Sequence, residues 1–427
     1  MSICDIGIPD LSLRHLKAAL YVARDKSVTR AANKLNRSQT AITKAINDLE
    51  AQLGVPLFDR SATGMLPTAH GAAMVTRVAL AEAEFAAAEK AYRNFIQKPP
   101  GNNPVFSLEI SYKRLAAFIA LYESGDINVA AGMLGVTRAA VYNSTRQLED
   151  LLEITLFERE PNGFAPTSYS NVLARHIKLA FSQIRHGLDD LANLSGITRG
   201  SVAIGTLPYT RTILTPRAII LLLNDHPQLD VSTREGPYSI LEASLRNGDL
   251  DFIIGALRTA HSPPDLRTEI LFHDRLSIIA RKGHPLANCR GLSLHQLTDH
   301  QWVLPGRNTP SRQLFDEILC HHGLAAPQHC VETSSLSTLR GLLLESDRIA
   351  LLSEHQIYYD NQYGLLTALP IELKDSYRPI GVTMRAHTTP SPAAALFLNH
   401  LRNVAAEPDS PASKIENGYR SLSPLPG

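Results

Sequence analysis

The chain of 427 residues has little cysteine and almost no net charge. Its four cysteines, Cys4, Cys289, Cys320 and Cys330, show no CxxC spacing, so we expect no disulfide framework. Cys320 is expected to face the core from a helix. No apolar run approaches the roughly 18 residues of a membrane-spanning helix, and the first residues lack the basic start and apolar stretch of a secretory signal. These absences predict a cytoplasmic protein that has no contact with a membrane and carries no metal or other cofactor.

Catalytic motifs are missing as well. The chain contains no glycine-rich phosphate loop, no G-x-S-x-G nucleophile motif and no H-E-x-x-H sequence, so we expect that it is not an enzyme. A net charge of +1 carries no signal for nucleic acid, and any such signal must be local. The length is too great for one core and predicts three or four units.

The most informative feature that is present is an internal repeat. Residues 13–71 (the first copy) and 112–170 (the second copy) align without a gap at a constant offset of 99. The matched positions include Leu16 with Leu115, Ala31 and Ala32 with Ala130 and Ala131, Leu49 and Glu50 with Leu148 and Glu149, Leu57 and Phe58 with Leu156 and Phe157, and Gly64 with Gly163. Because a solenoid needs three or more shorter repeats, this pattern indicates one structural unit that is copied once.

The first copy predicts three helices and a wing. Helices are expected over 13–24, 29–35 and 38–53, the second of them capped by the hydroxyl group of Thr29. A two-stranded wing is expected over 59–66. Two short helices joined by a tight turn, the second with polar side chains facing outward, are the helix-turn-helix arrangement that enters the major groove of DNA.

The outward side chains of the third helix suit DNA. Glutamine and asparagine can read adenine edges, threonine can contact the thymine methyl group, and lysine and arginine bind phosphates. The sequence predicts a DNA-binding set made of Arg30, Lys34, Arg37, Ser38, Gln39, Thr40, Thr43, Lys44, Asn47 and Arg60.

This pattern resembles the winged helix-turn-helix of LysR-type transcriptional regulators. The residues that carry the resemblance are Leu16, Ala31, Ala32, Leu35, Ser38, Gln39, Ala41, Ile46, Leu49, Glu50, Leu53, Gly54, Pro56, Leu57, Phe58, Arg60, Pro67, Thr68 and Gly71. Thr40 departs from the family, which usually has proline there, but threonine is tolerated in the first turn of a helix. The resemblance implies double-stranded DNA and a small-molecule effector as partners, a homodimer or homotetramer, and RNA polymerase as a candidate partner.

The second copy keeps the apolar pattern but changes the surface. The first copy has nine Lys and Arg against four Asp and Glu, a net charge of +5, whereas the second has five against seven, a net charge of −2. Neutralisation of DNA phosphates supplies much of the affinity for DNA, so the two copies cannot have the same electrostatic attraction for DNA. Arg138, Asn143 and Arg146 still form a candidate second DNA site. Two interpretations stay open: a structural or dimerising module, or a unit that binds a further half-site.

A long helix with an apolar stripe follows each copy. The stripes run through Met74, Val78, Ala81, Phe85, Ala88, Tyr92 and Phe95, and through Ile177, Phe181, Ile184, Leu188 and Leu191. In the LysR family such a helix pairs two subunits. The alternative is that each helix packs on its own chain.

The C-terminal half alternates short strands with helices, which predicts a mostly parallel sheet covered on both faces. Residues 200–403 resemble the LysR-type effector domain, whose two α/β lobes are joined by two crossing strands, like periplasmic solute-binding proteins. Ligands of such sheets lie at the carboxyl ends of strands and at helix N-termini. This rule predicts effector contacts at Thr206, Tyr209, Thr210, Arg307, Asn308, Thr309, Thr333 and Ser334, with a carboxylate as one fitting ligand. The alternative is that these side chains are ordinary helix caps.

Together these features predict a multidomain fold with two α-rich winged helix-turn-helix units, long linker helices and a two-lobed α/β effector domain. The expected boundaries are 1–73 and 105–170 for the winged units, 74–104 and 171–198 for the linkers, 199–405 for the effector domain and 406–427 for a disordered tail. The predicted function is sequence-specific DNA binding under the control of a small-molecule effector. The alternatives are a co-regulator or small-molecule-binding protein that acts mainly through protein contacts, and an enzyme or solute-binding module on the two-lobed fold.

Overall fold

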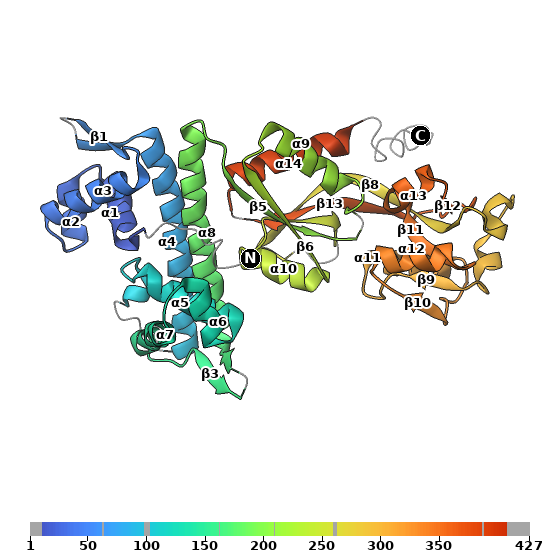
Figure 1. Cartoon of the computed structure of the whole chain (residues 1–427), viewed down its shortest axis with the longest axis horizontal. Coiled ribbons are helices and arrows are strands. Elements are labelled where there is room, and N and C mark those ends of the chain that lie inside the picture. The colour runs from blue at the N-terminus through green and yellow to red at the C-terminus, as the bar shows by residue number, and fades with distance from the viewer. Residues whose placement is uncertain are drawn as a thin grey trace, which may run out of the picture. The chain divides into compact units, whose positions relative to one another are not determined.

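The computed structural model (Figure 1) describes residues 11–61, 64–97, 103–161, 163–208, 210–258, 263–386 and 388–407. The chain divides into a first unit, Met1–Gly200 with Arg246–Asp249, and a second unit, Ser201–Leu245 with Leu250–Gly427. Residues 98–102 and the predicted tail from residue 408 onward lie outside the described residues.

Both copies in the first unit have three helices and a two-stranded antiparallel sheet, and a long helix follows each. In the first copy these are α1 (Leu13–Asp25), α2 (Val28–Lys34), α3 (Gln39–Leu53), β1 (Phe58–Ser61), β2 (Gly64–Pro67) and α4 (Ala69–Ile96). In the second they are α5 (Tyr112–Ser124), α6 (Ile127–Leu134), α7 (Arg138–Leu152), β3 (Phe157–Glu160), β4 (Gly163–Pro166) and α8 (Ser168–Leu194). A short 3₁₀ turn, η2 (Pro104–Phe106), precedes the second copy.

Local chemistry sets the ends of the helices. The side chain of Ser38 accepts a hydrogen bond from the backbone of Ala41 at the start of α3, and Gly54 ends that helix in the left-handed region with φ 69°. The predicted cap of α2 at Thr29 is wrong. Ser27 caps this helix instead by accepting from the amide of Arg30, since the helix begins one residue before Thr29.

A partly buried glutamate contact ties the wing to the third helix in both copies. Oε1 of Glu50 accepts hydrogen bonds from the amides of Leu57 at 2.7 Å and Phe58 at 3.1 Å. Glu149 makes the same two bonds to Leu156 and Phe157, at 2.7 and 3.3 Å. The repeated Leu-Glu and Leu-Phe pairs of the sequence are therefore parts of one contact that fixes the wing to the helix.

Glycine is required at the wing turn. A Cβ atom on Gly64, which has φ 126°, would lie 2.5 Å from the carbonyl oxygen of Lys26. A Cβ atom on Gly163, with φ 142°, would lie 2.2 Å from the carbonyl oxygen of Gly125. Each wing thus packs directly against the end of its first helix, where a side chain would clash.

The helices α4 and α8 pack against each other in antiparallel directions within one chain (Figure 1). Nδ1 of His176 lies 2.8 Å from Oε2 of Glu84, and Oη of Tyr169 donates to the carbonyl oxygen of Ala88 at 3.3 Å. Burial raises the pKa of the Tyr169 phenol, which keeps it protonated as a donor. In this structure each linker helix thus packs on its own chain, which is the alternative to the pairing of two subunits. Of the predicted stripe, Phe95 is more than half exposed, because it lies at the end of α4.

The second unit contains one nine-stranded mixed sheet in the order β10-β9-β11-β8-β13-β7-β5-β6, with β12 paired to β8. The first lobe contains β5 (Gly200–Thr206), α9 (Leu214–Asp225), β6 (Leu229–Glu235), α10 (Tyr238–Arg246), β7 (Phe252–Ala256) and α14 (Pro392–Ala406). The second contains β9 (Trp302–Leu304), α11 (Pro310–His321), β10 (Cys330–Glu332), α12 (Leu336–Leu344), β11 (Ile349–Ser353), α13 (Tyr358–Gln362) and β12 (Leu366–Ala368), with the short 3₁₀ helices η3 (Pro285–Asn288), η4 (Leu294–Leu297) and η5 (Glu354–Ile357). Helices cover both faces of each lobe, as the alternating pattern predicts.

Two long strands, β8 (Leu266–Arg281) and β13 (Tyr377–Arg385), run antiparallel and pass from one lobe to the other. Their pairing makes the sheet mixed rather than mostly parallel, and it confirms the two-lobed arrangement implied by the resemblance. The predicted burial of Cys320 is wrong, because this cysteine lies on the exposed side of α11.

Candidate DNA-binding face and effector site

The predicted reading face lies on α3. Gln39, Thr40, Lys44 and Asn47 are exposed, and Thr43 between them is half-buried. On the opposite side of the helix, Ile42, Ile46 and Leu49 enter the core. The burial of one side thus presents the polar side chains together on the other, as a recognition helix requires.

Basic side chains surround this helix, and several already have partners. Nζ of Lys34 lies 2.6 Å from a carboxylate oxygen of Asp25, and Arg30 donates to the backbone carbonyl oxygen of Asp25. Arg37 lies 3.6 Å from Glu109. These ion pairs are exposed on the basic side, so phosphates can compete for the cations. Arg60 lies on β1, the first strand of the wing.

The second copy presents a different set at the same places. Positions 39, 43, 44 and 47 of the first copy correspond to Arg138, Tyr142, Asn143 and Arg146, all of them exposed. Arg138 donates to Oδ1 of Asn128 at 3.2 Å. Arg146 lies 3.5 Å from Glu149 and 3.7 Å from Asp150. Glu149 corresponds to Glu50 of the first copy, whereas Asp150 corresponds to the uncharged Ala51.

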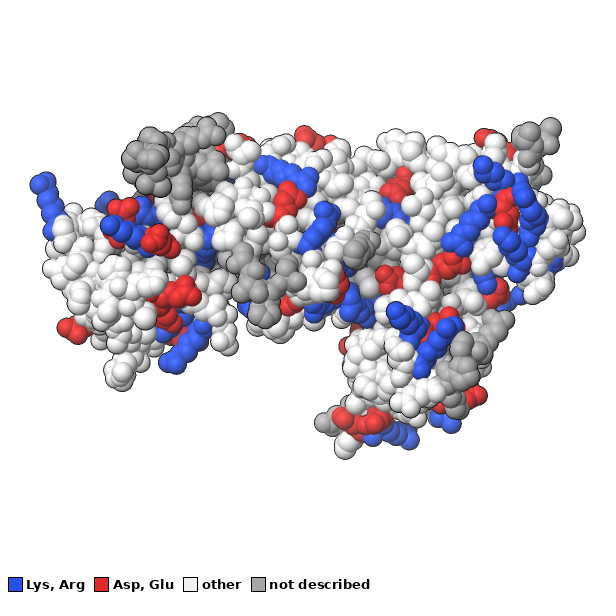
Figure 2. Space-filling view, turned by 180° about the vertical axis from the view of Figure 1, so that it is seen from behind, with Lys and Arg blue, Asp and Glu red and all other residues white. Residues whose placement is uncertain are grey.

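Figure 2 displays the charge difference on one face of the molecule. Acidic and basic side chains lie next to each other over the second copy, where the wing strand β3 carries two glutamates around one arginine. The equivalent strand β1 of the first copy reads Phe-Asp-Arg-Ser. The electrostatic attraction of the second copy for phosphate is therefore weaker, although the exposed face of α7 carries arginine.

The effector residues predicted in the first lobe are engaged in the fold. Thr206, at the end of β5, is buried and donates to the carbonyl oxygen of Arg234 at 3.4 Å. Thr210 is fully buried and donates to the carbonyl oxygen of Ile254 at 3.1 Å. Tyr209 lies outside the described residues. The hydroxyl of Thr206 thus joins β5 to β6, and that of Thr210 ties the turn after β5 to β7.

The effector residues predicted in the second lobe lie at two helix starts. Arg307, Asn308 and Ser334 are exposed. Thr309 caps α11, accepting from the amide of Arg312, and donates to Gly306, while Thr333 accepts from the amide of Ser335. These threonines serve as turn and cap residues, whatever else they contact.

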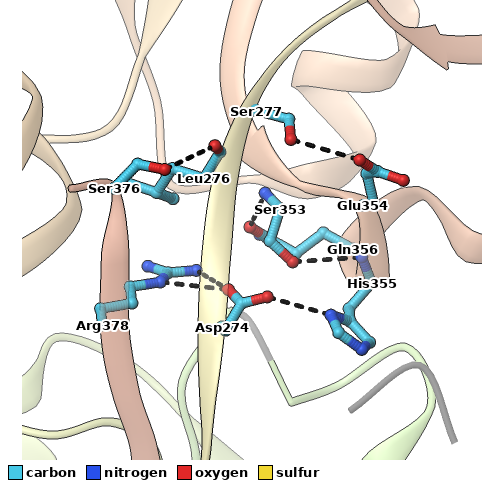
Figure 3. Close-up of polar contacts among 9 residues, drawn as sticks. All are labelled: Asp274, Leu276, Ser277, Ser353, Glu354, His355, Gln356, Ser376 and Arg378. Atoms are coloured by element: carbon cyan, nitrogen blue, oxygen red, sulfur yellow. Dashed lines mark hydrogen bonds and ion pairs between the residues drawn. The ribbon is translucent and has the colours of Figure 1, made fainter. Parts of the chain in front are cut away.

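A buried polar group, which the sequence did not reveal, joins the two crossing strands (Figure 3). Asp274 on β8 is fully buried between Arg378 on β13 and His355 of η5, which approach it from opposite sides. The Asp274 oxygens lie 3.2 Å from Nη2 of Arg378 and 3.0 Å from Nδ1 of His355. Arg378 also donates to the hydroxyl oxygen of Ser311 at the start of α11. We call Asp274, Ser311, His355 and Arg378 the hinge group.

Beside the hinge group, the guanidinium of Arg312 is buried and only partly paired. Its Nε lies 2.8 Å from Asp316, while its Nη1 has no hydrogen-bond partner among the described residues. A buried cation with an unused donor at the start of a helix is suited to an anion. In the second unit, Thr212 also donates to the carbonyl oxygen of Gln356 at 3.3 Å, which joins the first lobe to the second near the same strands.

Helix-turn-helix geometry ahead of a two-lobed α/β domain defines a ligand-responsive transcription regulator. The family model "Bacterial regulatory helix-turn-helix protein, lysR family" matches residues 13–72 and 112–170, and the model "LysR substrate binding domain" matches residues 195–406. The chain belongs to the LysR family of bacterial transcription regulators; it binds DNA under the control of a small-molecule effector and is not an enzyme.

Individual relatives agree with this assignment. The HTH-type transcriptional regulator GalR of Pseudomonas putida is 35% identical over 403 residues, which are 94% of this chain and 99% of GalR. The HTH-type transcriptional regulator PcaQ of Agrobacterium fabrum is 29% identical over 299 residues, 70% of this chain and 96% of PcaQ. The alignment with GalR is long enough to include both copies.

Solved structures share the fold. A full-length variant of OxyR from Pseudomonas aeruginosa has a TM-score of 0.54 at 20% identity and covers 71% of this chain and 97% of its own. CbnR, a LysR family transcriptional regulator, has a TM-score of 0.52 at 18% identity and covers 70% of this chain and 100% of its own. Within the described residues, no helix is long and apolar enough to cross a membrane.

Proposed function

We propose that the first copy is a winged helix-turn-helix that reads operator DNA with the exposed face of α3. The observation that carries this assignment is the set Gln39, Thr40, Thr43, Lys44 and Asn47, held outward on a helix whose other side is buried. Asn47 and Gln39 suit adenine, and Lys44 suits guanine. The charge of +5 on this copy supplies phosphate affinity through Arg30, Lys34, Arg37 and Arg60, and Ser38 completes the predicted DNA-binding set.

A charge-reversal variant tests this role. DNA selected from a random library by the full-length protein serves as the operator. Lys44→Glu is expected to weaken operator binding by 100-fold or more, because a base contact becomes a repulsion (about 3 kcal/mol). Lys90→Glu makes the same charge change on an exposed position of α4 and is expected to stay within a few-fold of the wild type. Equal losses of operator affinity in both variants would show that only the overall charge matters, and the assignment of α3 as the reading face would be wrong.

The effector is proposed to be a small carboxylate that binds beside the hinge group. The support is Nη1 of Arg312, a buried donor with no hydrogen-bond partner in the described part of the chain, at the start of α11 and next to Ser311. A carboxylate there would accept from the guanidinium and from helix amides. Because the hinge group joins both crossing strands, an anion at this place would favour one angle between the lobes, which is a population shift.

Ligand-induced thermal stabilisation by a panel of small carboxylates tests the effector site. Arg312→Gln should abolish the stabilisation seen with the wild type. Arg307→Gln removes the exposed arginine before α11 that the sequence also predicts as an effector contact, and if the carboxylate binds at Arg312 this variant should retain the stabilisation. The reverse result would move the site to the exposed loop. We further propose that the protein acts in the cytoplasm as a homo-oligomer, a dimer or tetramer of chains, with RNA polymerase as a partner.

A further inference from the structure

The repeat extends beyond the two copies into the long helices. The buried stripe of α4 includes Met74, Val78, Ala81, Phe85 and Ala88. At the same offset of 99, α8 has Leu173, Ile177, Ala180, Ile184 and Gly187, which are also buried. The duplicated segment is therefore a winged unit together with its linker helix.

The contacts between α4 and α8 have a two-fold pattern. Nη1 of Arg77 donates to Oε1 of Gln183 at 3.2 Å, and Nδ1 of His176 lies 2.8 Å from Oε2 of Glu84. His176 is the counterpart of Arg77, and Gln183 is the counterpart of Glu84. The first position of α4 thus contacts the counterpart of the second on α8, and the second contacts the counterpart of the first. Such a reciprocal interface is called isologous and is the kind found in a symmetric dimer.

The chain itself occupies both surfaces of this interface. Arg77 is buried and reaches Asp190 with Nε at 2.7 Å, while a Cβ atom on Gly187 would lie 3.0 Å from Sδ of Met74. The buried apolar residues of both copies and both helices form one continuous core. Neither apolar stripe remains available to the linker helix of another chain.

The helices α3 and α7, whose exposed faces differ, are thus held in one chain by a two-fold interface, as a symmetric dimer would hold two identical helices. The face of α3 carries Gln39, Lys44 and Asn47, whereas that of α7 carries Arg138, Tyr142, Asn143 and Arg146. Arginine prefers guanine, asparagine prefers adenine, and an exposed aromatic ring suits the thymine methyl group. The ion pairs of Arg146 with Glu149 and Asp150 are long and the arginine is exposed, so they oppose a DNA contact only weakly.

We propose that a single chain is a complete two-headed DNA reader, which binds an asymmetric operator of two unlike half-sites through α3 and α7, one chain for each pair of half-sites. The proposal rests on the proposed DNA-reading role of the first copy and extends it to the second. Covalent linkage replaces a bimolecular association by an effective concentration of the order of millimolar, so the pair does not dissociate on dilution.

Footprinting with matched variants tests the second reading head. On DNA selected by the full-length protein, hydroxyl-radical footprints are compared for the wild type, Lys44→Glu, Arg146→Glu and Lys113→Glu. The last is a charge reversal at an exposed position of α5 in the second copy. Each of the first two variants should lose protection over a different half-site and bind at least 10-fold more weakly. Lys113→Glu should retain both half-sites.

The outcomes separate the two proposals. If Lys44→Glu abolishes binding while Arg146→Glu leaves the footprint unchanged, the first copy reads DNA and the second does not, which overturns this inference alone. If Lys44→Glu has no effect, the proposed role of the first copy fails. A palindromic selected operator that needs two chains for two half-sites, counted from the mass of the complex, would also overturn the inference.

Cross-linking tests the intrachain pairing independently. In a background with the four native cysteines replaced by serine, Met74→Cys with Gly187→Cys should oxidise within one chain and run as a single chain on a denaturing gel. If this variant does not fold, Glu84→Cys with His176→Cys and a short bis-maleimide provides the same test. Cross-linked pairs of chains would show that α4 and α8 exchange between chains and would refute the one-chain reader.

Discussion

The glutamate that holds each wing gives a sharp test of how the repeated Leu-Glu sequence acts. Glu50→Ala removes the acceptor of the Leu57 and Phe58 amides, which are partly buried. Both bonds end on one charged oxygen, so we count them as one charge-assisted contact and expect a loss of about 2–3 kcal/mol in the local stability of the wing. Glu50→Gln keeps an acceptor oxygen but loses the charge, and about 1 kcal/mol should be lost.

Hydrogen–deuterium exchange over the segment 55–61 measures this loss directly. A local destabilisation of about 2–3 kcal/mol corresponds to exchange that is roughly 30- to 140-fold faster for amides that open locally. Glu149→Ala is the matched variant and should have the same effect on Leu156 and Phe157 while leaving the first wing unchanged. Unaltered exchange in Glu50→Ala, or equal effects of glutamine and alanine, would refute the role of the carboxylate.

Three further predictions follow from the same geometry. Gly71→Ala should destabilise the first unit by about 3 kcal/mol or more in thermal unfolding, because the new Cβ atom would lie 1.9 Å from the carbonyl oxygen of Leu57; a change below about 0.5 kcal/mol would contradict this close approach. Asp274→Asn should destabilise the second unit by about 3–5 kcal/mol, since Arg378 would be left buried without its carboxylate, and denaturant unfolding would show it. The pKa of Glu269 is lowered by its hydrogen bonds to a nearby arginine, so the stabilisation by this carboxylate is present above the unfolded pKa of about 4.3 and is lost as the pH falls through the lower folded value. Glu269→Gln should therefore reduce the fall in unfolding free energy at acidic pH. An unchanged fall at acidic pH would be inconsistent with the ion pair.

The sequence was sufficient for the elements with strong local signals. The helix α3 agrees with its predicted range to one residue, because its apolar period, the Ser38 cap and Gly54 all act locally. The strand β13 escaped prediction because Pro379 and Gly381 interrupt the usual strand pattern. Gly381 is needed there since a Cβ atom would lie 2.0 Å from the carbonyl oxygen of Glu269 on β8, where the register shifts.

Partners distant in sequence could not be predicted from single segments. The stripe on α4 indicates a buried face but not what covers it. Only contacts visible once the fold is known, those of Arg77 with Gln183 and of Glu84 with His176, identify α8 as the partner. The hinge group has the same limitation, because Asp274, His355 and Arg378 come from three segments with no shared motif. Serine and threonine after strands gave a weaker guide, since capping and ligand binding select the same residues.

The pairing of α4 with α8 inside one polypeptide has a genetic consequence. In a regulator whose reading heads come from separate subunits, a defective allele can mix with the normal product and spoil most of the pairs. In the proposed two-headed reader both heads come from one translation event, so a cell that expresses two alleles would form no mixed head pairs through these helices. In such a reader each recognition helix could also change without changing the other, so the two half-sites of its operator would be free to diverge separately over evolutionary time.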